Sequence, residues 1–153
     1  MPSWRDTASA LAQDDLDELL EVAIRTAAEE LAAEGEFYPF AAAVAGTGEV
    51  RLIAAPDSFD AQPQPTAEIR DRLLAILAAT AKELRAAAVV TDVRVSATGA
   101  DAIEITLEHV EGHPMRIVTP YVLRPGTSLD IDMDATSAHT STARIWAHPS
   151  PGR

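Results

Sequence analysis

The stretch DAIEITLEHVEGHPMRIVTPYVL, residues 101–123, shows the pattern that decides the fold. Its first half alternates apolar and polar side chains with the period of a strand that buries one face. Ile103, Ile105 and Leu107 form the apolar side of that alternation. Residues 115–123 are a second segment rich in β-branched side chains, and the connector VEGHP is short enough for antiparallel neighbours. The stretch therefore predicts a β-hairpin.

Upstream of this hairpin, residues 14–34 carry apolar side chains at spacings of three and four, which predicts an amphipathic helix. Asp14 or Asp15 can cap its start, and Gly35 is a natural stop. The remaining elements are read in the same way from their periodicity. They are strands at 40–45 and 49–54 joined by GTG, a helix at 66–88, and a strand at 88–97.

The order of these elements is helix, two strands, helix, three strands. It predicts an α+β domain with an antiparallel five-stranded sheet and with both helices on one face. Residues 128–135 alternate between apolar and acidic side chains and are an alternative sixth strand. The element order is similar to that of roadblock, longin and profilin-like domains, and this resemblance concerns topology alone.

One domain accounts for the 153 residues. We expect an N-terminal arm at 1–13, the α+β domain at 14–124 and a C-terminal extension at 125–153. Within that extension, Trp146 is expected to return to the body of the domain, ahead of a frayed tail.

Composition excludes several classes of function. The chain has no cysteine, which removes disulfides, zinc–thiolate sites, iron–sulfur clusters and cysteine nucleophiles. A formal charge of −12 without a basic stripe argues against nucleic acids and anionic membranes as partners. No segment has the pattern of a signal peptide or a membrane span, so we expect a cytoplasmic protein. The abundance of alanine and the single lysine are typical of GC-rich bacterial genomes. No cofactor is predicted.

The turn of the hairpin holds the densest group of chemically useful side chains, Glu108, His109, Glu111 and His113. The alternation places His109 on the apolar face and Glu108 on the opposite one. A bend could still bring Glu108, His109 and His113 together as metal ligands. The competing interpretation, which we favour, is a polar turn with one half-buried and one exposed histidine.

The run DIDMD, residues 130–134, resembles the start of a calcium-binding EF-hand loop. Ala135 stands where that loop needs glycine and Ser141 where it needs a bidentate glutamate, so we reject an EF-hand. Three carboxylates on one strand face could still hold a divalent cation weakly. The alternative is a charged outer face that protects a sheet edge.

The stretch YPFAAAVAGTGEV, residues 38–50, resembles the opening hairpin of cytidine deaminases. Deaminase chemistry needs cysteine ligands to zinc, and the chain has none, so an active deaminase is excluded. The GTG turn lacks the lysine and the following helix of a phosphate-binding loop.

Two hypotheses of function remain. The first is a non-catalytic protein-interaction or self-associating module, expected to be a homodimer or to bind another protein, with its surface near Tyr38, Tyr121 and His113. The second is a metal-binding protein or a small metal-assisted hydrolase that uses Glu108, His109 and His113. Since no catalytic constellation is complete, the first hypothesis is favoured.

Overall fold

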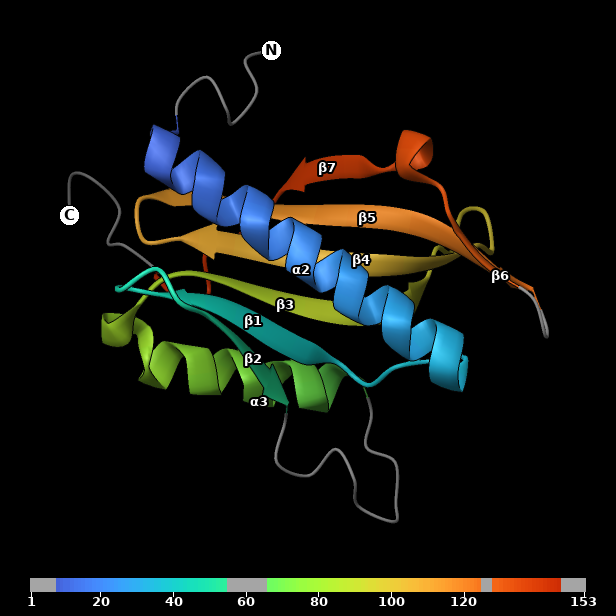
Figure 1. Cartoon of the computed structure of the whole chain (residues 1–153), viewed down its shortest axis with the longest axis horizontal. Coiled ribbons are helices and arrows are strands. Elements are labelled where there is room, and N and C mark those ends of the chain that lie inside the picture. Colours follow the sequence, from blue (N-terminus) through green and yellow to red (C-terminus); the bar gives the residue numbers. More distant parts are fainter. Residues whose placement is uncertain (1–7, 55–65, 125–127, 147–153) are drawn as a thin grey trace.

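The computed structural model describes residues 8–54, 66–124 and 128–146, and Figure 1 shows their arrangement. Most of the predicted N-terminal arm, the proline-rich connector after residue 54 and the tail from residue 147 lie outside these residues.

The described chain contains two α-helices and one antiparallel sheet, which confirms the α+β class. Neither helix has the length and apolarity that crossing a bilayer would require. Two short 3₁₀ helices complete the set. The elements are α2 (Ala10–Glu34), β1 (Phe40–Ala45), β2 (Val50–Ala54), α3 (Thr66–Ala79), η1 (Ala81–Glu83), β3 (Leu84–Arg94), β4 (Asp101–His109), β5 (Gly112–Arg124), β6 (Ser128–Ile131), η2 (Met133–Ala135) and β7 (Ser137–Thr140).

The strands lie in the order β2-β1-β3-β4-β5-β6, and β7 also pairs with β5. β6 pairs with the end of β5 at Tyr121, whereas β7 pairs with the part around Arg116. The sheet of the described chain thus has seven strands, where the sequence pattern predicts five with a sixth as the alternative. The sixth strand is present but ends at Ile131, and the seventh was missed because residues 137–140 are polar and mostly exposed, without a period-two apolar pattern.

The helices pack on opposite faces of the sheet, so the prediction that both cover one face is wrong. α2 packs on a layer that includes Ala42 and Ala88, and α3 packs on a layer that includes Ala41 and Ala87. Successive strand residues point to opposite faces, so these pairs mark the two sides of β1 and β3. A strand that is buried on both faces has small or apolar residues at every position. Its sequence therefore does not show which helix packs on which face. In Figure 1, α2 crosses in front of the sheet, and α3 lies below β1 and β2 in the view.

The first helix starts earlier than its predicted cap. Ser9 is the N-cap, and its Oγ accepts a hydrogen bond from the Ala12 N–H at 3.1 Å. Asp15, one of the two predicted caps, lies instead in the second turn of α2 and is 3% exposed. The predicted stop is confirmed, since Gly35 adopts a φ of 80° at the C-terminal end.

The second helix ends at Ala79, nine residues before its predicted end at residue 88. Thr80 terminates it, and its hydroxyl donates to the Ile76 carbonyl at 3.0 Å. The first five of the residues that follow, LRAAA at 84–88, are good helix formers, but they form part of the central strand β3. Their burial between two helices outweighs their helix propensity.

Candidate functional site

The predicted hairpin is present, and it separates the two adjacent candidate ligands Glu108 and His109. β4 and β5 pair in an antiparallel register that closes with His109 opposite Gly112. Both side chains are buried, and they lie on opposite faces of the sheet because successive strand residues alternate. Each binds a different part of the chain.

His109 lies beside α2, where it forms a buried polar cluster with Asp15 and Arg85. The His109 Nε2 and the Asp15 Oδ2 are 2.9 Å apart. Arg85, at the start of β3, donates to both carboxylate oxygens of Asp15 at 2.9 and 3.0 Å. The side chains of His109 and Asp15 are 1% and 4% exposed, so the carboxylate is desolvated and paired on two sides.

The hydrogen bonds of His109 fix its tautomer. The Glu111 backbone N–H donates to His109 Nδ1 at 3.1 Å, so Nδ1 is the unprotonated nitrogen. The proton of the neutral ring is then on Nε2 and is donated to Asp15. Since both nitrogens are occupied, this histidine has no lone pair free for a metal or for a substrate proton. The sequence placed His109 at the end of the apolar face, and the structure shows it fully buried.

Glu108 holds the C-terminal segment against the other face of the sheet. Its carboxylate accepts backbone N–H groups of Arg144 at 3.0 Å, Ile145 at 3.1 Å and Trp146 at 3.3 Å. Ile145 and Trp146 pack against the apolar layer beside α3. The expected return of Trp146 to the domain is therefore confirmed, while the expected outward-facing Glu108 is in fact buried under that segment.

His113 takes a third position. It lies where the β4–β5 register shifts, is partly exposed, and has a φ of 59°, a left-handed conformation that is uncommon outside glycine. Within the described part of the chain, no three His, Asp or Glu side chains gather as metal ligands would. Glu108, His109 and His113 are thus not brought together.

The aspartates of the run at residues 130–134 also lie in different environments. Asp130 pairs with Arg124 at 3.3 Å, and Asp132 caps η2 by accepting the Ala135 N–H at 3.1 Å. β6 has already ended at Ile131, so the three carboxylates do not share one strand face.

Tyr121 and Tyr38, two residues of the predicted interaction surface, lie in different environments. Tyr121 is 6% exposed, and its hydroxyl donates to Asp92 Oδ1 at 2.7 Å. Burial raises the pKa of Asp92, and the carboxylates of Asp101 and Glu36 raise it further. The hydrogen bonds from Tyr121 and from the Phe37 backbone lower this pKa but do not offset the rise. Burial also raises the pKa of Tyr121, as does the carboxylate of Asp92. His113 lies eight positions from Tyr121 on β5, roughly 26 Å along a strand.

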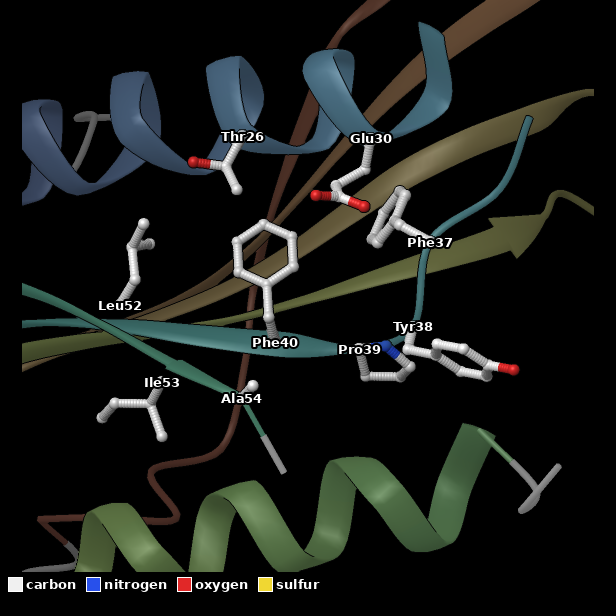
Figure 2. Close-up of a pocket in the computed structure, with 9 residues that line it drawn as sticks. All are labelled: Thr26, Glu30, Phe37, Tyr38, Pro39, Phe40, Leu52, Ile53 and Ala54. Atoms are coloured by element: carbon white, nitrogen blue, oxygen red, sulfur yellow. The ribbon is translucent and has the colours of Figure 1, made fainter. Parts of the chain in front are cut away.

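Tyr38 borders an apolar groove of about 270 Å³ between α2 and β2. Figure 2 shows Thr26 and Glu30 pointing from α2 toward the strands, with Phe40 and Leu52 pointing back. The other lining residues are apolar or aromatic. Leu52 is 57% exposed and Tyr38 47% exposed, which leaves large apolar side chains at the groove and on the adjacent edge.

A second hollow, of about 380 Å³, opens on the α3 side of β4, β5 and β7. Its charges are largely cancelled, since Arg116 pairs with Glu104 at 3.3 Å. Ser137 and His139 are hydrogen bonded at 2.9 Å on the same face. No carboxylate contacts this histidine among the described residues, so the pair lacks the third member of a catalytic triad.

The features that the sequence reading missed are Asp15, Arg85 and Leu52. Asp15 stood out only as a helix cap, and Arg85 fell within the over-extended helix. The one available signal for Asp15 was its helical spacing, four residues before Leu19 of the apolar stripe. Comparison with models of known protein families, with curated proteins and with solved structures finds no match.

Proposed function

We propose that this protein is a non-catalytic, self-associating interaction module of the cytoplasm, and that it associates through the outer edge of β2. The observation that carries the proposal is the exposed Leu52 on an edge strand next to the apolar groove. An edge strand with unpaired backbone groups is a template for another strand. Soluble proteins that associate do so most often as symmetric pairs of identical chains.

The backbone of β2 is oriented for such pairing. The Ala45 N–H donates to the Glu49 carbonyl at 2.8 Å, which makes these two residues a hydrogen-bonded pair of the β1–β2 ladder. In an antiparallel ladder, such pairs alternate with pairs whose N–H and C=O groups point away. Val50 and Leu52 therefore direct their N–H and C=O groups toward the outer edge.

Helix placement leaves this edge accessible in the described chain. α2 packs mainly on β1, β3 and β4, and α3 packs on β1 and β3. Leu52 pairs with Ala42 in the sheet register, so its side chain is on the α2 side, where the groove is. An incoming strand would bury both Leu52 and the mouth of the groove.

The charge of β2 favours this surface over the rest of the molecule. Two chains of charge −12 repel each other, so contact is least costly where the local charge is balanced. Glu49 and Arg51 balance each other here, with 3.2 Å between Oε1 and Nε.

The polar sites support a non-catalytic role. His109 has both nitrogens engaged, and Glu108 is occupied by three backbone N–H groups. The metal-binding or hydrolase alternative that uses Glu108, His109 and His113 receives no support from these positions. The roadblock- or profilin-like order of elements remains a proposal about fold relationship and assigns no activity.

The test is the molar mass of the purified chain, measured by light scattering and sedimentation velocity at micromolar concentration. We expect twice the chain mass for the wild type and the chain mass for Leu52→Lys, because a buried lysine opposes strand pairing. Val122→Lys is the matched control, since Val122 is 56% exposed on β5, away from this edge. A monomeric wild type, or equal effects of the two variants, would overturn the proposal.

A further inference from the structure

We propose that the second copy pairs with β2 in an antiparallel register whose two-fold axis passes through Val50. This inference rests on the proposed self-association and specifies its geometry. It follows from the opposite charges on either side of Val50. When two copies run antiparallel, Glu49 of each copy lies opposite Arg51 of the other only if the axis passes through Val50.

Charge distinguishes the registers whose axis passes through one of the first three residues of β2. With the axis at Val50, each Glu49 lies opposite Arg51 of the second copy. With the axis at Arg51, the two arginines lie opposite each other, and like charges directly opposite are destabilising. With the axis at Leu52, Arg51 lies opposite Ile53 and gains no charged partner. Only the first register satisfies both charges.

Backbone geometry is compatible with the same register. Val50 directs its N–H and C=O outward, so two copies of Val50 form a hydrogen-bonded pair. The flanking Glu49–Arg51 pairs are then of the non-hydrogen-bonded type, with Cα atoms about 4.5 Å apart and side chains close together. The intrachain Glu49–Arg51 contact at 3.2 Å shows that the two side chains already lie on the same face.

Side-chain size is compatible too. In this register Leu52 lies opposite Gly48 of the second copy, which has no side chain to obstruct it. Gly48 has a φ of 94°, so the second strand turns away at this point. The turn at residues 46–48 of the second copy is thereby brought to the mouth of the groove beside Ala54.

Charge variants test the register. Arg51→Glu leaves acids at positions 49 and 51, and Glu49→Arg leaves arginines there, so each variant alone should dissociate at least tenfold more readily than the wild type. An equimolar mixture of the two should form a heterodimer. The double variant Glu49→Arg/Arg51→Glu restores opposite charges across the axis and should recover the wild-type mass.

The Glu49→Arg variant separates local pairing from general repulsion. It replaces one negative charge with one positive, which changes the net charge from −12 to −10. General repulsion would then fall and association would strengthen. The Val50 register predicts the opposite result.

Cysteine variants locate the axis independently, because the chain has no cysteine of its own. Residues of a hydrogen-bonded pair have Cα atoms about 5.5 Å apart, within the range of a disulfide. We expect Val50→Cys to form a covalent dimer under copper–phenanthroline oxidation. Leu52→Cys should not, because the two Leu52 positions would be roughly 14 Å apart. The readout is a non-reducing gel.

The outcomes separate this inference from the proposed function. A wild-type dimer in which Leu52→Cys crosslinks, or in which the charge variants have no effect, would overturn the Val50 register and leave self-association intact. A monomeric wild type, together with no crosslink in either cysteine variant, would overturn both the register and the self-association. A monomer whose Leu52 binds a different protein would also overturn both.

Discussion

The imidazole of His109 and the carboxylate of Asp15 lie 2.9 Å apart, although 94 residues separate them in the chain. Arg85 completes the cluster from a third element, β3. Nearby, the Ser9 hydroxyl donates to Glu111 at 2.8 Å. The start of α2 is thus fixed to the β4–β5 turn and to the start of β3, which makes this cluster a structural anchor.

We expect Asp15→Ala to lower the free energy of unfolding by about 3 kcal/mol, because it leaves a buried imidazole and a partly buried guanidinium without their acceptor. Urea denaturation followed by circular dichroism measures the loss. Asp14→Ala is the matched control, since Asp14 is the exposed preceding residue of the same helix. If both variants unfold at the same urea concentration, the cluster does not anchor the helix.

The carboxylate of Glu108 should control the position of Trp146. In a Trp4→Phe background, which leaves Trp146 as the sole tryptophan, we expect Glu108→Ala to shift the emission to longer wavelength and to increase quenching by acrylamide. The loss of stability should be about 2 kcal/mol, since charge-assisted hydrogen bonds are removed. Glu104→Ala, four residues away on the same face of β4, is the control. An emission spectrum that does not change would place Trp146 elsewhere.

Close approach of α3 to the sheet should depend on alanine in β1. Ala43 has no exposed surface and belongs to the layer that packs on α3. We expect Ala43→Leu to cost about 1–3 kcal/mol through overpacking. Ala138→Leu, at an exposed position of β7, should have little effect. Urea midpoints test this, and equal midpoints would mean that the helix does not approach closely.

The elements that follow a clear period were predictable. The alternation around Ile105 gave β4, and the three–four spacing before Gly35 gave most of α2. The end of the second helix was not predictable in this way, because Leu84 and the alanines after it fit a helix as well as a strand. Only the burial of these residues between two helices makes them a strand, β3, and not a continuation of the helix.

The polar contacts were less predictable than the elements. Alternation correctly separated Glu108 from His109, but no local pattern shows that Asp15 would reach His109 across 94 residues. Such a contact depends on which face of the sheet a helix covers. Because β1 and β3 are buried on both faces, the sequence carried no signal for that choice.

Asp92 provides the pH dependence that this structure predicts. Its pKa in the folded protein is raised above the ordinary value of 3.8, mainly by burial. The folded state therefore holds the Asp92 proton more tightly than the unfolded state does. Stability from this group is highest when the carboxyl is protonated, and it is lost as the pH rises through the folded-state pKa.

Asp92→Asn should remove that loss, because the amide stays neutral and its oxygen can still accept from Tyr121. We expect the wild type to lose more free energy of unfolding than this variant between about pH 4 and about pH 7. Urea denaturation across that range provides the comparison, with Asp130→Asn, whose side chain is 58% exposed, as the control. Parallel curves for the wild type and Asp92→Asn would mean that the Tyr121 hydrogen bond compensates fully for burial of the charged form.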